Sequence, residues 1–116
     1  MYTEITVEGR KKRKSIKALV DTGATYLVLD PETVKELELM RTPYEVKLTL
    51  ADKRATMATL YLAQVEAKGR KGPVLVAELA VPVALLGVFA LESLGLKPNP
   101  LSGNLETIGP EGGYLL

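Results

Sequence analysis

The chain has 116 residues, of which 47% are hydrophobic and 25% are charged, and its formal net charge is +1. This composition is that of an ordinary globular domain, and the small net charge provides no general attraction to nucleic acid or to anionic membranes. The length predicts a single domain, 1–116, with a core over about residues 2–108 and a Gly- and Pro-rich tail over residues 97–116.

The sequence contains neither cysteine nor histidine. Disulfides, thiolate nucleophiles, histidine-ligated zinc, and serine or cysteine triads with an imidazole base are therefore excluded. Carboxylates remain as the catalysts, and neither a metal site nor a cofactor is predicted. The longest uncharged stretch, residues 79–91, has 13 residues and contains a proline, so it is too short to span a membrane. A cytoplasmic protein is the expectation.

Short segments rich in Val, Leu, Thr and Tyr, separated by Gly, Pro and charged turns, predict an all-β fold. Residues 2–8 alternate between polar and apolar side chains, as expected of a strand. The basic residues that follow predict a turn over residues 9–14, and residues 15–20 return as the second strand of a hairpin that ends at Asp21. A buried strand is predicted at residues 26–29.

One or two short helices are predicted as well. Asp30 at the N-cap and Pro31 at the first helical position predict a helix from Pro31 to about residue 39. A second helix is predicted at residues 88–94, ended by Gly95. Further strands are predicted at residues 45–50, 55–66, 73–79 and 104–108, with turns at residues 51–54 and 69–72.

The most informative motif is Asp21-Thr22-Gly23-Ala24, which directly follows an apolar strand. A long hairpin around residues 50–54 comes next, and Leu85-Leu86-Gly87 then precedes the second helix. This ordered set resembles the retropepsin-like aspartic proteases, the single-domain family that includes the retroviral enzymes. The resemblance spans roughly residues 5–106 and implies an all-β, closed-barrel-like acid protease (retropepsin) fold.

The resemblance implies an aspartic endopeptidase. Hydrolysis of a peptide by this chemistry needs two carboxylates that share a proton across one water molecule, with the ionised one acting as general base. Only Asp21 stands in the required context, so the resemblance implies a homodimer with the site on its two-fold axis and one catalytic Asp21 from each protomer. The expected substrate is a polypeptide, with no cofactor, no nucleic acid and no membrane as partners.

The resemblance also assigns roles around Asp21. Thr22 would hydrogen-bond to the opposite turn, Gly23 would let the backbone approach the substrate, and Ala24 would pack beneath the site. Leu85, Leu86 and Gly87 would support the catalytic loop, and the hairpin would close over the substrate as a flap. The predicted substrate-binding residues are Gly23, Ala24, Thr25, Leu50, Ala51, Asp52, Lys53, Val83 and Leu85.

The sequence departs from the retroviral pattern in its flap, where a stiffer hairpin is expected, and at two positions whose change alters the expected outer subsites. The hairpin tip, residues 50–54, is charged and has no glycine, where retroviral flaps are glycine-rich. Thr25-Tyr26 follows the motif in place of acidic residues, and Val88 stands where those enzymes carry an arginine. Cleavage specificity therefore cannot be transferred from the family.

Alternative interpretations stay open. Asp21 in isolation is an ordinary turn residue, and a retropepsin fold also suits a non-catalytic dimerisation or peptide-binding module. A weaker alternative is nucleic-acid binding by the basic residues 10–14, for which a solvated hairpin tip is the favoured interpretation. Asp30 is interpreted as a helix cap, Asp52 as a turn residue, and Tyr26 and Phe89 as core. Candidate interface strands are residues 1–5 together with 104–108 or 114–116.

Overall fold

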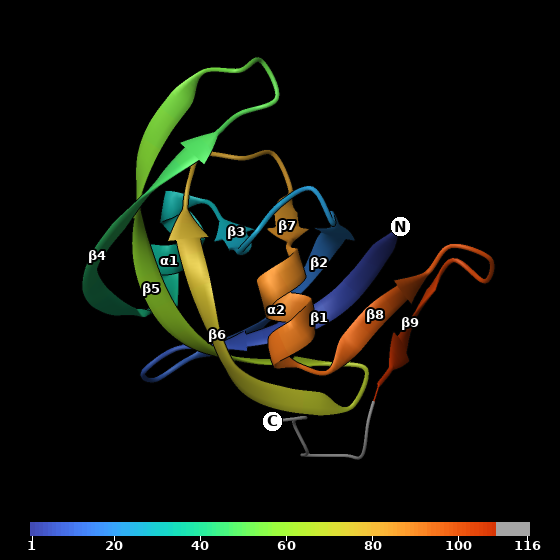
Figure 1. The fold of residues 1–116 in the computed structure, drawn as a ribbon. Coiled ribbons are helices and arrows are strands. Elements are labelled where there is room, and N and C mark those ends of the chain that lie inside the picture. Colours follow the sequence, from blue (N-terminus) through green and yellow to red (C-terminus); the bar gives the residue numbers. More distant parts are fainter. Residues whose placement is uncertain (109–116) are drawn as a thin grey trace.

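The computed structural model describes residues 1–108, which form mostly strands and two short helices (Figure 1). The strands are β1 (Tyr2–Glu8), β2 (Arg13–Val20), β3 (Leu27–Leu29), β4 (Met40–Thr49), β5 (Ala55–Ala67), β6 (Arg70–Glu78), β7 (Ala84–Leu86), β8 (Leu96–Asn99) and β9 (Asn104–Thr107). The helices are α1 (Pro31–Glu36) and α2 (Val88–Ser93). Among these described residues, no helix has the length and apolar character needed to cross a bilayer.

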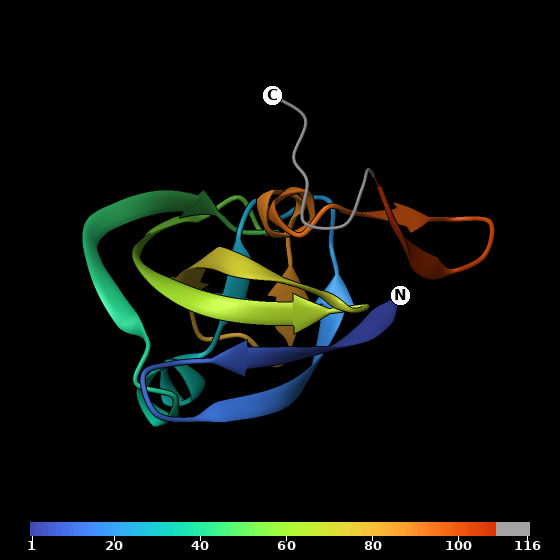
Figure 2. The ribbon, with the colours of Figure 1, turned by 90° about the horizontal axis from the view of Figure 1, so that it is seen from below.

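The main sheet closes on itself to form a barrel, as the sequence predicted. Its strand order is β1-β2-β7-β3-β6-β5-β4, and β1 also pairs with β5 through Thr6–Glu8 opposite Gln64–Glu66. This pairing joins β1, β2, β7, β3, β6 and β5 into a ring. The remaining strand, β4, pairs with β5 and with no other described strand, and the β4–β5 hairpin arches over one end of the barrel (Figures 1 and 2).

The alternation of side chains in the strands fills the barrel. In β1, Thr3, Ile5 and Val7 point inward and are buried, whereas the residues between them are more exposed. The buried core draws on nearly every element. Its fully buried large side chains are Ile5, Val7, Leu27, Leu29, Leu37, Val65, Val74, Val76, Leu86, Leu91 and Leu96. Removing each of these side chains from water contributes about 1.5–3 kcal/mol, which makes the barrel interior the main source of stability.

Helix α1 ends earlier than the sequence predicted. Pro31 occupies the first turn, but the helix stops at Glu36 because Glu38 adopts a left-handed conformation with φ of 50°. That turn directs Leu37 and Leu39 into the core. Asp30 stands at the N-cap position, yet its side chain makes no capping hydrogen bond, so its predicted role as a cap is wrong in that respect.

The turn between β5 and β6 is also shorter than predicted. Ala67 pairs with Arg70, so the connection consists of Lys68 and Gly69 alone, with φ angles of 51° and 77°. Two consecutive positive φ values are typical of the tight turns that match the twist of a hairpin. Arg70 and Lys71, predicted as turn residues, therefore belong to β6.

Residues 96–107 form a hairpin of two strands rather than the single predicted strand. β8 pairs antiparallel with β9 in a separate two-stranded sheet, with Pro98 opposite Leu105. Proline is tolerated there because β8 pairs on one edge alone within the described part of the chain. The predicted Gly- and Pro-rich tail therefore includes two paired strands, β8 and β9, of which only Leu96 lies before residue 97. The candidate interface strand at residues 114–116 lies outside the described residues.

Candidate active site

The turn that carries Asp21 lies at the end of three neighbouring strands. β7 pairs in parallel with β2 and antiparallel with β3, so it lies between the strand before the turn and the strand after it. The chain leaves β2 at Val20, passes over the end of β7 and enters β3 at Leu27. Because β2 and β3 are both fixed to the same central strand, the turn between them is held at both ends.

Hydrogen bonds within the turn fix the position of the Asp21 carboxylate. The Asp21 N–H donates to the Leu86 carbonyl at 3.0 Å, and the Asp21 carbonyl accepts from the Ala24 N–H at 3.0 Å. The carboxylate oxygen Oδ1 accepts from the Gly23 N–H at 2.9 Å. A Cβ atom at Gly23 would lie 3.1 Å from that same oxygen, so any side chain there would press on the carboxylate.

Helix α2 supports the turn from behind. Its first N–H groups have no partner inside the helix, and here those of Val88 and Phe89 donate to the carbonyls of Ala24 and Thr25, both at 2.9 Å. Gly87, the N-cap, donates its N–H to the Tyr26 carbonyl at 3.1 Å. The start of the helix is therefore bonded, residue by residue, to the segment that follows Asp21.

Gly87 makes this close approach possible. A Cβ atom at this position would overlap the Tyr26 carbonyl oxygen and would lie 2.6 Å from the Thr25 carbonyl carbon and 2.8 Å from the Ala24 oxygen. All three are backbone atoms, which cannot move aside without shifting the turn. Glycine is thus the residue that the packing of α2 against the turn requires.

A cleft of about 580 Å³ lies between the Asp21 turn and the β4–β5 hairpin. It is lined by Asp21, Gly23, Ala24, Thr25, Tyr26, Val28, Lys47, Leu48, Thr49, Leu50, Ala51, Leu79, Val81 and Leu85. Most of these side chains are apolar or uncharged, as is typical of ligand-binding clefts.

The structure brings together many, but not all, of the predicted site residues. Those that line the cleft are Asp21, Gly23, Ala24, Thr25, Leu50, Ala51 and Leu85. Thr22, Leu86, Gly87, Asp52, Lys53 and Val83 are not among the lining residues. Leu86 and Gly87 instead contact the turn from behind through their backbone. Val81, from the loop that precedes β7, stands in the wall where Val83 was expected.

The sequence interpretation missed Tyr26. It predicted Tyr26 and Phe89 as core, but Tyr26 is only half-buried and lines the cleft, and Phe89 is 53% exposed on α2. The two rings contact each other edge to face, with centroids 6.0 Å apart and planes at 82°. The position of Tyr26 two residues after the motif was the available signal. Its side-chain direction depends on α2, which is distant in the sequence.

The tip of the β4–β5 hairpin is held by local bonds. Leu50 and Arg54 are joined by an N–H to carbonyl bond of 2.8 Å, and Lys53 adopts a φ of 69° without being glycine. The Asp52 carboxylate accepts the Arg54 N–H at 3.0 Å and pairs with the Arg54 guanidinium. Asp52 therefore acts in the turn, and its carboxylate is engaged there.

The chemical groups in the cleft are few. Of the described residues that line it, Asp21 alone carries a carboxylate, and Lys47 alone carries a positive charge. The Thr22 side chain is exposed, and no described residue of the same chain forms a hydrogen bond with its hydroxyl. Residues 1–108 contain no group of three His, Cys, Asp or Glu side chains placed to hold a metal ion.

The structure is similar to EIAV protease solved in complex with the inhibitor HBY-793, with a TM-score of 0.67 and 21% sequence identity over 82% of this chain and 88% of that chain. At this identity the likeness concerns the fold. A search of curated proteins finds no match. Residues 5–93 match the model of the gag-polyprotein putative aspartyl proteases. The chain therefore belongs to this family of retropepsin-like aspartic proteases.

Proposed function

We propose that the protein is a homodimeric aspartic endopeptidase in which two Asp21 side chains, one from each protomer, activate a water molecule. The observation that carries this proposal is the cleft itself, in which a single carboxylate is held by the Gly23 N–H beside a wall of uncharged side chains. Peptide hydrolysis of this kind needs a second carboxylate. The described residues that line the cleft include no carboxylate besides that of Asp21, so the second carboxylate comes from another copy of the chain.

In the dimer the two carboxylates have different tasks. The ionised Asp21 takes a proton from the water as the water attacks the scissile carbonyl carbon. The protonated Asp21 of the partner donates a hydrogen bond to the carbonyl oxygen, where negative charge develops. The proton then passes to the leaving nitrogen as the carbon–nitrogen bond breaks. Since one acid and one base are needed, the rate has a bell-shaped dependence on pH.

Several features of the protomer support a two-fold arrangement. The exposed Thr22 hydroxyl has no partner among the described residues of its own chain and is available to a second turn. In β1, the ladder with β5 covers only Thr6–Glu8, so no strand among residues 1–108 pairs with that edge of residues 2–5. The outer edges of the β8–β9 hairpin likewise pair with no other described strand. The N-terminus and this hairpin lie on the same side of the molecule in both views (Figures 1 and 2).

The β4–β5 hairpin acts in this proposal as the flap. Leu48, Leu50 and Ala51 line the cleft opposite the Asp21 turn, so the hairpin covers an extended substrate and offers backbone hydrogen bonds. The Asp52–Arg54 pair links two residues of its tip. A flap without glycine is expected to open by movement of the whole hairpin rather than by unfolding of its tip.

The test combines cleavage with oligomeric state. Wild-type protein is incubated with casein and a peptide library between about pH 4 and 7, and sedimentation gives its mass at micromolar concentration. Asp21→Asn, which preserves shape, is expected to abolish cleavage and to leave both the fold and the dimer intact. Unchanged cleavage by Asp21→Asn, or cleavage by a protein that sediments only as a monomer, contradicts the proposal. Peptide binding without cleavage by wild type favours the non-catalytic peptide-binding module.

A further inference from the structure

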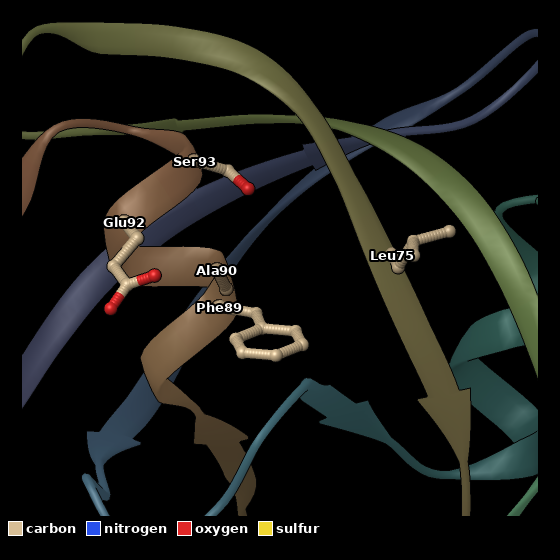
Figure 3. Close-up of a pocket in the computed structure, with 5 residues that line it drawn as sticks. All are labelled: Leu75, Phe89, Ala90, Glu92 and Ser93. Carbon is tan, nitrogen blue, oxygen red and sulfur yellow. The ribbon is translucent and has the colours of Figure 1, made fainter. Parts of the chain in front are cut away.

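A row of exposed apolar side chains crosses the outer face of the barrel. Met40 on β4 lies opposite Leu62 on β5, and Leu62 lies opposite Leu75 on β6. Side chains at directly opposed positions are close neighbours on one face of a sheet. The three are 54%, 37% and 42% exposed, and Figure 3 shows the Leu75 side chain leaving β6 on the side away from α2. We call these three residues the outer apolar strip.

A groove of about 200 Å³ extends the outer apolar strip toward the β1–β2 turn. Met40 and Leu62 line it together with Pro73 from β6 and Arg10 from the turn. The groove lies where β1 and β4 meet end to end along β5, since the β1 ladder stops at Gln64 and the β4 ladder begins at Leu62. It shares no residue with the cleft beside Asp21.

The turn beside this groove carries a concentrated positive charge. Residues 10–14 are five consecutive Arg and Lys residues, all exposed, in a chain whose net charge is only +1. Two of them have acidic neighbours on α1: Lys14 forms an ion pair with Glu36 at 3.1 Å, and Lys12 borders the same acidic surface. The backbone does not require this run, because none of these residues has a positive φ angle.

The other three cations of the turn are uncompensated. Among residues 1–108, Arg10, Lys11 and Arg13 form no ion pair. The nearest carboxylate on the rim of the groove, that of Glu8, is engaged by Lys71 at 3.8 Å. Because adjacent like charges repel one another, this end of the groove favours a ligand that brings negative charge.

We propose that this surface is a docking site for an acidic peptide segment of a partner protein. The carboxylates of the segment pair with the three uncompensated cations, and apolar side chains next to them cover the outer apolar strip. Neighbouring strands lie about 4.8 Å apart, so the strip is roughly 10 Å long and matches a few residues of extended chain. A peptide is favoured over nucleic acid because neither groove nor strip includes an aromatic ring on which a base could stack.

Docking at this surface leaves the Asp21 cleft open. In Figure 1 the β1–β2 turn and the tip of the β4–β5 hairpin lie at opposite ends of the molecule. Binding of the acidic segment is therefore independent of the proposed cleavage activity, and its test needs no measurement of turnover.

The test uses a fluorescent peptide in which a block of glutamates precedes alternating leucines and serines. Fluorescence anisotropy gives its affinity for the wild-type protein, and a repeat with Asp21→Asn excludes cleavage of the peptide during the measurement. Replacing the glutamates by lysines, or the leucines by serines, should weaken binding at least about fivefold. Failure of the original peptide to bind, or equal binding of all three peptides, overturns the proposal.

One pair of double variants tests the charged end of the site. Arg10→Ser combined with Arg13→Ser should weaken binding about fivefold and should reduce its dependence on salt. Lys17→Ser combined with Lys97→Ser removes the same charge from other exposed positions and should change the affinity less than about twofold. Equal effects of the two double variants would show a general charge attraction and would overturn the proposal.

A second pair of variants tests the apolar part. Leu62→Thr should weaken binding about fivefold, because apolar contact area is lost. Leu101→Thr, at a leucine that is 97% exposed on the β8–β9 hairpin, is the control and should leave the affinity unchanged. If Leu62→Thr does not fold, Met40→Thr replaces it, since that side chain is 54% exposed.

Amide chemical shifts locate the bound peptide. It should move the signals of residues 9–13, Met40, Leu62 and Leu75 and leave those of residues 21–26 unchanged. Shift changes confined to residues 21–26 and 48–51 would place the peptide in the cleft and overturn the proposal. Single-stranded RNA of the same length is the second probe. Equally tight binding of that RNA, with Leu62→Thr without effect on either ligand, would identify a nucleic-acid surface instead.

Discussion

Replacing Gly87 with alanine tests whether close packing of α2 against the Asp21 turn sets up the active site. The added methyl group would overlap the Tyr26 carbonyl oxygen and approach the Thr25 carbonyl carbon to 2.6 Å. Since both are backbone atoms, the start of α2 and the turn must move apart. We expect this movement to weaken the hydrogen bonds from the N–H groups of Val88 and Phe89.

The size of the effect follows from these contacts. Overpacking of this kind costs about 1–3 kcal/mol, and each weakened hydrogen bond adds up to about 1 kcal/mol. We therefore expect Gly87→Ala to lower the free energy of unfolding by roughly 2–4 kcal/mol, or the melting temperature by roughly 10 °C. Displacement of the turn by even a fraction of an ångström should also lower kcat/KM at least about tenfold. The assay is carried out well below the melting temperature of the variant, so that only folded protein is compared.

Gly9→Ala is the matched control. A Cβ atom at Gly9 would overlap the Leu37 carbonyl oxygen and lie 2.8 Å from its carbon, so the overpacking is at least as severe. Gly9 does not line the cleft. We expect a similar loss of melting temperature with kcat/KM unchanged in the folded protein. Full activity in Gly87→Ala, or an equal loss of activity in both variants, would refute the reasoning.

Two further predictions concern the hairpin tip and the response to alkaline pH. Asp52→Ala removes the bonds to Arg54, so amide hydrogen exchange at the hairpin tip should become faster and KM should rise about threefold. Lys53→Ala, the control, should change neither quantity. Equal exchange rates in wild type and both variants would contradict the claim that the Asp52–Arg54 bonds stabilise the tip. Burial, reinforced by the charge of Glu78, raises the pKa of Tyr61 above its ordinary value of 10.0. Because the folded state then holds its proton more tightly than the unfolded state, this contribution to stability is complete below pH 10.0 and is lost as pH rises through the folded pKa. Urea unfolding should show a smaller alkaline loss for Tyr61→Phe than for wild type, and parallel losses would contradict this assignment.

The elements that the sequence predicted best have a strong local pattern. The alternation in β1 and the long apolar pattern of β5 specify both the strand and its buried face. The Asp21 motif and Leu85-Leu86-Gly87 are far apart in the sequence, and their family resemblance led us to expect them to lie together. The structure joins them through the bond from the Asp21 N–H to the Leu86 carbonyl.

The features that were missed depend on tertiary contacts. β8 contains Pro98, and a proline argues against a strand unless the strand lies at the edge of a sheet. The sequence does not show that β8 is such an edge strand. Val81 reaches the cleft from a loop, where the alternation of a strand does not apply, and so it replaced Val83 in the wall. Tyr26 lines the cleft with its ring in contact with Phe89, on a helix much later in the chain. No pattern within a short window of sequence carries this information.

The central claim is that each protomer holds half of a catalytic site, and a subunit-mixing experiment tests it most directly. Wild type and Asp21→Asn are mixed in equal amounts, allowed to exchange subunits, and assayed at constant total protein concentration. If both carboxylates are needed, only dimers with two wild-type chains are active, and the activity falls to about one quarter of that of pure wild type. An activity of about one half would show that each chain works alone and would contradict the account.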